Sequence, residues 1–309
     1  MRLVYLGTPP FAVPTLEAIL RAGHDVIEVV TQPDRPKGRG NKLAMPAVKA
    51  CALAHNLSVF QPERVRRPEA VDRLRALAPE IMVVVGYGQI IPQVVIDIAP
   101  RGIVNVHGSL LPRLRGAAPV QWAIARGEIE TGVTTMQIDA GLDTGDLLLS
   151  AATHIGENED AIALGERLSH MGAELLVETL SGLEAGTIVP QKQDNALATY
   201  APILRKQDGR IDWNQPAQFI HNLIRGMQPW PGAQSSFRGQ AFQIWLSHKV
   251  DAQSPARPGR LITNRDGVFV GCGDGGLLKL IEVQLEGRKR MSADEFARGH
   301  RVGENEKLD

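Results

Sequence analysis

The first half of the chain alternates short apolar segments with segments whose apolar residues recur at helical spacing. The apolar segments predict strands at Leu3–Leu6, Val26–Val30, Val59–Phe60, Ile81–Val85 and Ile103–Val106. The helical spacing predicts helices over Phe11–Arg21, Ala47–His55 and Glu69–Leu77. Strands that alternate with helices favour parallel pairing through crossover connections. We therefore expect an α/β fold, with a doubly wound, mostly parallel (Rossmann-like) sheet.

The second half has a different pattern. A long helix is predicted over Ala161–Leu183, and residues 190–207 have little periodicity and several turn formers, as in a linker. After a helix at Pro216–Met227 come five short segments between glycine turns: Ala233–Phe237, Phe242–Leu246, Gly259–Ile262, Val268–Gly271 and Leu277–Gln284. They suggest a small OB-like β-barrel. The expected domains are residues 1–189 (catalytic), 190–207 (linker) and 208–309 (barrel).

The C-terminal residues carry two further patterns. Ser292 and Glu295 have the spacing of a capping box and predict a short last helix. The polar tail GENEKLD is expected to fray.

Composition and length exclude several classes of protein. The 309 residues suffice for two domains, and 43% hydrophobic with 22% charged residues is ordinary for a globular protein. No apolar run reaches the roughly 18 residues that span a bilayer, and MRLVYLGTPPFAV lacks the pattern of a signal peptide. Cys51 and Cys272 show no metal-ligand spacing. We expect a cytoplasmic protein without a metal site or a membrane partner.

Charge is spread unevenly, although the net charge is zero. From residue 205 onward the chain has 16 basic and 12 acidic residues, a net of +4, which leaves −4 for the first 204 residues. This modest asymmetry allows a polyanionic partner for the C-terminal part without requiring one.

Polar residues of three kinds gather in two glycine-rich segments. The run NVHGSLLPRLRGAAPVQW begins at Asn105 and contains His107, and the later segment GLDTGD contains Asp143. Asn105 and His107 lie where the Ile103 strand ends, the edge at which α/β sheets place their chemistry. An amide that holds an oxyanion, an imidazole that moves a proton and a carboxylate that orients them form a carbonyl-transfer site. By position alone, Asp146 competes with Asp143.

The pattern Asn-x-His, then SLLPxxRG, then an Asp in a Gly-rich turn resembles the signature of formyltransferases that use 10-formyltetrahydrofolate. The resemblance implies that Asn105, His107 and Asp143 are catalytic, with Asp143 preferred over Asp146. The residues Ala117–Pro119 after Arg-Gly are most similar to family members that act on methionyl initiator tRNA. The implied reaction moves a formyl group from 10-formyltetrahydrofolate to the methionyl α-amino group.

The resemblance also implies binding residues. Folate contacts are expected from two segments: Ser109, Leu110, Leu111 and Pro112, and Gly86, Tyr87, Gly88, Gln89 and Ile90. The long segment Thr31–Lys49 follows the second strand and contains Arg35, Lys37, Arg39 and Lys42, which are expected to contact tRNA. A second basic cluster, Arg64, Arg66 and Arg67, is interpreted as solvated surface.

Three alternatives stay open. A formyltransferase for a glycinamide ribonucleotide would lack the C-terminal barrel, and one for an amino-sugar nucleotide would lack the TQPDRPKGRG loop. A tRNA-binding protein without catalysis would not need the intact set of Asn105, His107 and Asp143. A folate-dependent hydrolase would have no amine acceptor. The favoured hypothesis is a monomeric formyltransferase whose partners are folate and initiator methionyl-tRNA.

Overall fold

The chain folds into two compact units in a computed structural model that describes residues 1–37, 42–303 and 306–309. The first unit contains residues 1–116, 131–153 and 165–200, and the second contains residues 117–130, 154–164 and 201–309. Of the predicted linker, residues 190–200 belong to the first unit and residues 201–207 to the second. No helix in the described ranges has the length and apolarity needed to cross a membrane.

The first unit is built on a seven-stranded sheet in the order β5-β2-β1-β6-β7-β8-β9. Its strands are β1 (Arg2–Gly7), β2 (Asp25–Val30), β5 (Val59–Phe60), β6 (Ile81–Val85), β7 (Ile103–His107), β8 (Glu130–Gln137) and β9 (Leu147–His154). Pairing from β5 through β7 is parallel, and β8 runs antiparallel to β7. The predicted mostly parallel sheet is confirmed. The sequence did not predict β8 and β9.

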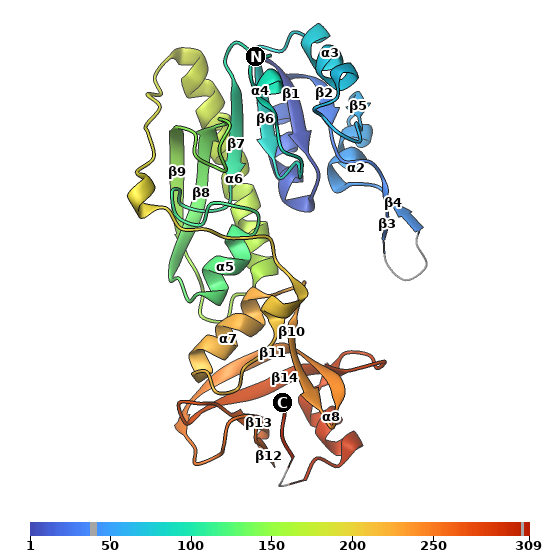
Figure 1. The fold of residues 1–309 in the computed structure, drawn as a ribbon, viewed down its shortest axis with the longest axis vertical. Coiled ribbons are helices and arrows are strands. Elements are labelled where there is room, and N and C mark those ends of the chain that lie inside the picture. The colour runs from blue at the N-terminus through green and yellow to red at the C-terminus, as the bar shows by residue number, and fades with distance from the viewer. Residues whose placement is uncertain (38–41, 304–305) are drawn as a thin grey trace. The chain divides into compact units, whose positions relative to one another are not determined.

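Helices cover both faces of this sheet (Figure 1). They are α1 (Val13–Arg21), preceded by the 3-10 turn η1 (Pro10–Ala12), α2 (Ala47–Ala54), α3 (Pro68–Ala76), α4 (Gln93–Ile96) and α6 (Ala161–Ala185). Leu16 of α1 and Leu176 of α6 share one buried cluster with Leu3 and Tyr5 of β1. The alternate residues of β1 share the opposite cluster with α3 and α4. The sheet is thus doubly wound.

The segment predicted as a basic loop forms a short antiparallel ribbon. Its strands are β3 (Arg35–Lys37) and β4 (Lys42–Ala44), and Arg35 pairs with Ala44. Arg39 lies outside the described residues. Lys37 and Lys42 are described only as backbone.

The second unit contains an antiparallel sheet and three helices. Its strands are β10 (Ala233–Phe237), β11 (Gln240–Gln253), β12 (Leu261–Asn264), β13 (Gly267–Gly271), β14 (Gly276–Leu285) and β15 (Met291–Ser292), and its helices are α5 (Pro119–Ala125), α7 (Ala217–Gly226) and α8 (Ala293–His300). The path β10-β11-β14-β13-β12 has β15 added beside β14. All five predicted strands are present. The OB-like barrel remains a prediction that this sheet is compatible with.

Three packed aromatic side chains lie in the core of the second unit. The ring of Phe296 in α8 lies 5.0 Å from that of Phe237 and 4.7 Å from that of Phe242, centroid to centroid. The predicted capping box is confirmed, because the Glu295 N–H donates to Ser292 Oγ (3.2 Å) and the Ser292 N–H donates to Glu295 Oε2 (3.1 Å).

The expectation of a frayed tail is wrong for the last residues. Leu308 is 2% exposed and its N–H donates to the Gly259 carbonyl at 2.8 Å. The Asp309 N–H donates to the Ser236 carbonyl at 3.0 Å. Burial of a single leucine among polar neighbours anchors a segment whose composition otherwise predicts disorder.

Two further 3-10 turns, η2 (Asn195–Leu197) and η3 (Lys206–Gly209), lie between α6 and α7.

Candidate functional site

Two predicted catalytic residues project from one strand to one side of the sheet. Asn105 and His107 are two positions apart on β7, and side chains at that spacing share a face. Their neighbours Val104 and Val106 lie in the buried cluster on the opposite face. Asn105 is 8% exposed and His107 is 6% exposed. The strand therefore fixes both polar groups in a nearly dry environment at its carboxyl end.

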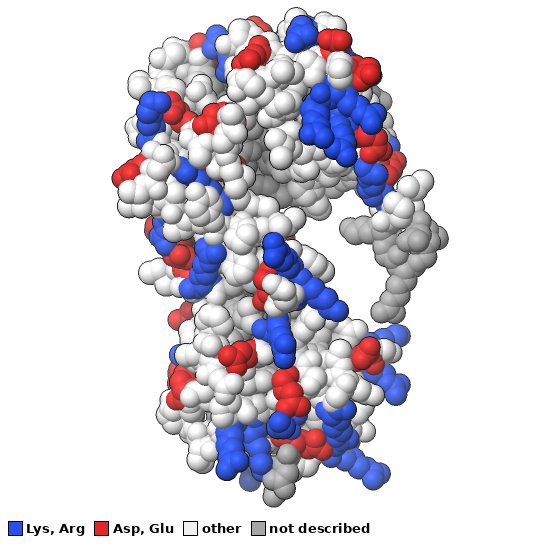
Figure 2. Space-filling model, viewed as in Figure 1, with Lys and Arg blue, Asp and Glu red and all other residues white. Residues whose placement is uncertain are grey.

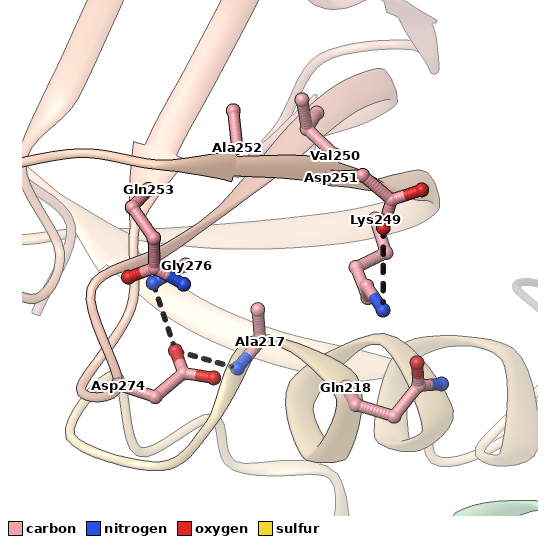
Figure 3. A pocket seen from close by; sticks show the side chains of 9 residues that line it. All are labelled: Ala217, Gln218, Lys249, Val250, Asp251, Ala252, Gln253, Asp274 and Gly276. Carbon is pink, nitrogen blue, oxygen red and sulfur yellow. Dashed lines mark hydrogen bonds and ion pairs between the residues drawn. The ribbon is translucent and has the colours of Figure 1, made fainter.

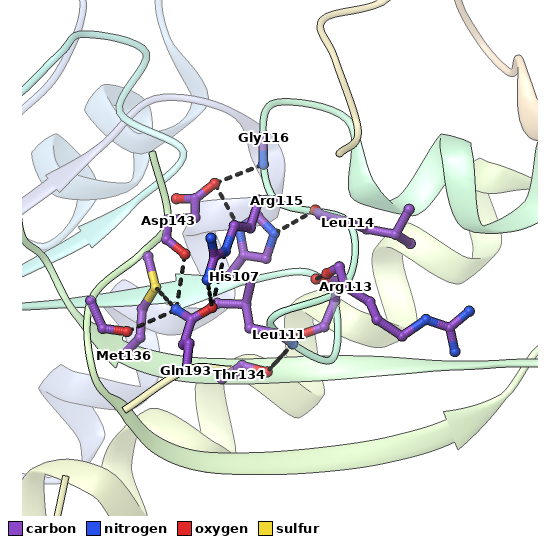
Figure 4. Close-up of polar contacts among 12 residues, drawn as sticks. His107, Leu111, Arg113, Leu114, Arg115, Gly116, Thr134, Met136, Asp143 and Gln193 are labelled. Atoms are coloured by element: carbon purple, nitrogen blue, oxygen red, sulfur yellow. Dashed lines mark hydrogen bonds and ion pairs between the residues drawn. The ribbon is translucent and has the colours of Figure 1, made fainter. Parts of the chain in front are cut away.

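The hydrogen bonds of His107 define its tautomer. His107 Nε2 lies 3.0 Å from the carbonyl oxygen of Leu114 (Figure 4). A carbonyl can only accept, so Nε2 carries the hydrogen. The other ring nitrogen, Nδ1, lies 3.8 Å from Asp143 Oδ2. In the neutral ring Nδ1 presents a lone pair, and it is the nitrogen that can take up and release a proton beside a carboxylate.

The structure brings Asp143, and not Asp146, to the imidazole. Asp143 lies in the turn between β8 and β9, and its Oδ2 accepts the N–H of Gly116 at 2.8 Å. Asp146 instead lies 3.8 Å from the ammonium group of Lys192, whose side chain is 91% exposed. Asp143 has a φ of +52°, a left-handed conformation that non-glycine residues adopt at a cost of about 1–2 kcal/mol. The turn is held in that conformation by bonds to other segments.

The side-chain amide of Asn105 is available for a ligand. Among the described residues, none makes a hydrogen bond to it. The Asn105 amide atoms are not among the fully buried polar atoms that lack a partner, so a ligand can reach them. Together the three groups offer an N–H donor, a proton carrier and a fixed negative charge, which is the requirement for addition to a carbonyl carbon.

The loop that follows β7 is held in place by hydrogen bonds to Thr134 of β8 and by bonds within the loop. The Thr134 hydroxyl donates to the Ser109 carbonyl (2.7 Å) and accepts the Leu111 N–H (3.2 Å). The Ser109 hydroxyl donates to the Arg113 carbonyl (2.6 Å), and Ser109 is 1% exposed. Within the predicted folate segment, the Ser109 side chain and the Leu111 backbone N–H therefore support the loop, and Leu111 is 7% exposed. Leu110 and Pro112 are the partly exposed members.

The second predicted folate segment combines backbone turns with one exposed side chain. Gly86 and Gly88 have φ values of +55° and +83°, and a Cβ on Gly86 would lie 2.9 Å from the Pro9 ring. Tyr87 packs in the core, where burial raises the pKa of its phenol well above the ordinary value. Gln89 Oε1 accepts the Val65 N–H at 2.7 Å. Ile90 is 92% exposed, so it is the apolar side chain here that can meet a flat ligand.

Of the basic residues predicted to bind tRNA, Arg35 is the one whose side chain is described, and it lies at the surface. The Arg35 guanidinium lies 2.6 Å from Glu63 Oε2, and both side chains are more than half exposed. Arg64, Arg66 and Arg67 are exposed, as predicted. Figure 2 shows Lys and Arg side chains gathered over the part of the first unit near α3, with acidic side chains among them. Glu63 thus offsets part of the positive charge of this region.

Two other clusters contain none of the predicted site residues. In the second unit, a cavity of about 360 Å³ is lined by Ala217, Gln218, Lys249, Val250, Asp251, Ala252, Gln253, Asp274 and Gly276 (Figure 3). Asp274 Oδ1 accepts the Ala217 N–H there at 3.2 Å. Within the described ranges, one group with ligand atoms suited to a metal ion is Glu17, Cys51 and His55, whose ligand atoms lie within 4.8 Å of one another.

Sequence reasoning missed Gln193 and gave Arg115 no role beyond the motif. Gln193 contacts the turn that holds Asp143 and the loop that holds Leu114, although its sequence context predicts a linker. Its partner Arg115 is 78 residues away in the chain. No local spacing indicates a contact at that separation.

Comparison with known proteins agrees with this geometry. Residues 1–180 match the formyl transferase family model, and residues 203–301 match the model of the formyl transferase C-terminal domain. The chain is 63% identical over 308 residues to a methionyl-tRNA formyltransferase from Solibacter usitatus, covering 100% of this chain and 98% of that protein. It is 51% identical to one from Geobacter metallireducens, covering 98% and 96%.

The fold is also found in a solved structure. The N-formyltransferase from Helicobacter canadensis, in complex with folinic acid and dTDP-3-aminofucose, has a TM-score of 0.68 at 19% identity and covers 91% of this chain and 98% of its own. This likeness shows a shared fold, whereas the sequence relatives match at high identity along the whole chain. The protein therefore belongs to the methionyl-tRNA formyltransferase family.

Proposed function

We propose that this protein transfers the formyl group of 10-formyltetrahydrofolate to the α-amino group of methionyl initiator tRNA. The observation that carries the proposal is the meeting of His107 Nδ1 and Asp143 Oδ2 at 3.8 Å, on the sheet face that also presents Asn105. The relatives that match this chain along nearly their full length are named methionyl-tRNA formyltransferases, which also supports the proposal.

The chemistry assigns one task to each residue. The amine nitrogen of the methionyl group attacks the formyl carbon, and the carbonyl oxygen becomes an oxyanion that accepts the Asn105 amide N–H. His107 Nδ1 takes the proton that the amine releases, and Asp143 stabilises the imidazolium that results. When the bond between the formyl carbon and the folate nitrogen breaks, the His107 imidazolium gives its proton to that nitrogen, which regenerates the neutral imidazole. Atoms and charge balance, because one N–H bond is broken and one is formed.

The two substrates are assigned to different parts of the chain. We place folate against Leu110, Pro112 and Ile90, the exposed apolar members of the two predicted segments. We assign tRNA to Arg35, Lys37, Arg39 and Lys42 and to the net +4 charge from residue 205 onward. The catalytic domain is then residues 1–189, the linker residues 190–207 and the OB-like tRNA-binding domain residues 208–309. We expect the protein to act as a monomer in the cytoplasm, where charged tRNA is used.

The direct test offers the purified protein 10-formyltetrahydrofolate and methionyl initiator tRNA. After ester hydrolysis, formylmethionine is measured by mass spectrometry. Asn105→Ala should lower the turnover roughly 100- to 1000-fold, as expected when an oxyanion donor is removed.

Two alternative acceptors are assayed in parallel to test the proposal against its competitors. Methionyl elongator tRNA tests the acceptor, and a dTDP-linked amino sugar tests the chemistry of the fold neighbour. Faster formylation of the amino sugar than of methionyl initiator tRNA would refute the proposal. Release of formate without any formylated acceptor would indicate the hydrolase alternative.

A further inference from the structure

Gln193 uses all the hydrogen-bonding capacity of its side chain to join the two loops of the candidate site. Gln193 Nε2 donates to the carbonyl oxygens of Asp143 (2.9 Å) and Gly145 (2.8 Å). Its Oε1 accepts from Arg115 Nε (3.0 Å) and Nη2 (2.7 Å). The guanidinium offers only donors and the carbonyls only acceptors, so the amide has a single favourable orientation.

The contacts form a closed ring that passes through Asp143 (Figure 4). Arg115 holds Gln193, Gln193 holds the backbone of Asp143, and the Asp143 carboxylate accepts the N–H of Gly116, the next residue after Arg115. On the other side of Arg115, the Leu114 carbonyl holds His107 Nε2. One ring thus fixes both the carboxylate and the imidazole that it faces.

The Asp143 turn needs this support because its backbone is unfavourable on its own. Asp143 has a φ of +52°, and its carbonyl is one of the two that Gln193 binds. Arg115 is 2% exposed, so its guanidinium is a firmly packed anchor. Its backbone is also tied down, since the Arg115 N–H donates to the Thr199 carbonyl at 2.8 Å.

We propose that Gln193 is a positioning residue that sets the place of the Asp143 carboxylate relative to His107, with Arg115 holding its amide in orientation. The inference rests on the proposed function, because it needs Asp143 to act on His107 during formyl transfer. The described partners of the Gln193 side chain are Arg115, Met136 and the backbone of the Asp143 turn, and none of them is a reacting atom of the proposed mechanism. Its contribution is the geometry of the turn.

Gln193→Glu separates positioning from general support. Glutamate has the same length and strengthens the bond to Arg115, but it replaces the two donors by an oxygen that faces two carbonyls. A residue that merely anchors Arg115 would tolerate the change. If Gln193 is a positioning residue, turnover should fall about 100-fold, because misplacing a catalytic group by about 1 Å costs about that factor. The KM values for folate and tRNA should stay within about threefold, because KM changes when binding common to substrate and transition state is removed.

Asn195→Asp is the matched control. Asn195 Oδ1 also accepts from Arg115 Nη2 (2.9 Å), and the change from amide to acid is the same. Asn195→Asp should keep near-wild-type turnover, and Gln193→Met, which preserves volume without hydrogen bonds, should behave like Gln193→Glu. Urea unfolding checks that each variant folds. Turnover of Gln193→Glu within threefold of wild type, or an equal loss in Asn195→Asp, would overturn the proposal.

A spectroscopic readout keeps the inference independent of activity. The ring ¹⁵N signals of His107, assigned with His107→Asn, should shift in Gln193→Glu and stay in place in Asn195→Asp. An unchanged His107 spectrum in a folded Gln193→Glu protein counts against positioning. If the wild-type protein fails to formylate the charged tRNA, the proposed function is wrong, and the His107 spectrum still tests whether Gln193 places the carboxylate.

Discussion

Asp143→Asn changes the charge beside His107 and almost nothing else. The asparagine oxygen can still accept the Gly116 N–H, so the turn keeps its main side-chain bond. The carboxylate lies 3.8 Å from Nδ1, and the two side chains are 18% and 7% exposed. At an effective dielectric constant near 20, opposite unit charges at about 4 Å attract by about 4 kcal/mol. That attraction acts when the imidazole carries the proton taken from the amine, hence in the transition state of the proposed reaction.

A loss of about 4 kcal/mol from the transition state corresponds to roughly a 1000-fold slower reaction. Solvent screening at the exposed edge of Asp143 reduces this, so we expect turnover to fall roughly 100- to 1000-fold with KM values nearly unchanged. The assay is single-turnover formylation of methionyl initiator tRNA under saturating folate, which isolates the chemical step.

Asp146→Asn is the control for this change. Asp146 faces the exposed Lys192, and exposed ion pairs contribute at most about 1 kcal/mol, so turnover should stay close to wild type. If Asp143→Asn retains more than a tenth of the wild-type rate, the electrostatic role assigned to Asp143 is wrong. Equal losses in both variants would mean that the turn, and not the charge, matters.

Three further predictions concern tRNA, acid stability and the turn. Neutralising Arg35, Lys37, Arg39 and Lys42 together should weaken tRNA use. The slope of log affinity for tRNA against log salt concentration should fall by about one unit or slightly less for each phosphate contact that is lost. The control Glu63→Gln, which removes the acidic partner of Arg35, should not weaken tRNA use. Burial lowers the pKa of His221 below its ordinary 6.5. The unfolded chain then binds the proton more readily, so stability present above about pH 6.5 is lost as pH falls, and His221→Gln should flatten the dependence of the urea midpoint on pH between about 7.5 and 5. Finally, a Cβ on Gly145 would lie 1.8 Å from the Gln137 carbonyl oxygen, so Gly145→Ala should abolish turnover and lower the melting temperature, whereas Gly299→Ala, which meets nothing within 4 Å, should do neither.

Local patterns predicted the elements of this fold well. Ile81–Val85 is all apolar because both faces of β6 are covered, and that run alone defines the strand. The strand β8 was missed for the opposite reason, whereas β9 was not predicted although it begins with the apolar residues Leu147, Leu148 and Leu149. β8 contains Thr131, Thr134 and Thr135, which are buried at 3% exposure or less, so its sequence lacks an apolar run. At least two of these threonines are hydrogen-bonded, and those bonds depend on partners that the strand's own sequence does not reveal.

The candidate catalytic residues could be selected from the sequence because they lie within a few positions of recognisable turns. Asn105 and His107 lie at the end of the buried strand β7, and Asp143 lies in a turn between Gly141 and Gly145. The folate segment was only partly interpretable. The sequence cannot distinguish Ser109, whose hydroxyl supports the loop, from Pro112, which remains partly exposed, since both lie in the same turn.

The stretch predicted as a linker shows where local reasoning ends. Residues 191–200 have no periodic pattern because they make isolated bridges and not a continuous ladder: Gln191 bridges Leu147, the first residue of β9, and Tyr200 bridges Arg115. The Leu147 N–H donates to the Gln191 carbonyl (2.7 Å), and the Leu114 N–H donates to Thr199 Oγ1 (2.9 Å). A segment that satisfies the polar groups of two loops of the candidate site is itself polar and irregular, which is also the composition of a linker. Only the positions of its partners in the structure distinguish a supporting segment from a linker. At Gln193 this distinction matters for the chemistry, because Gln193 supports the turn that holds Asp143.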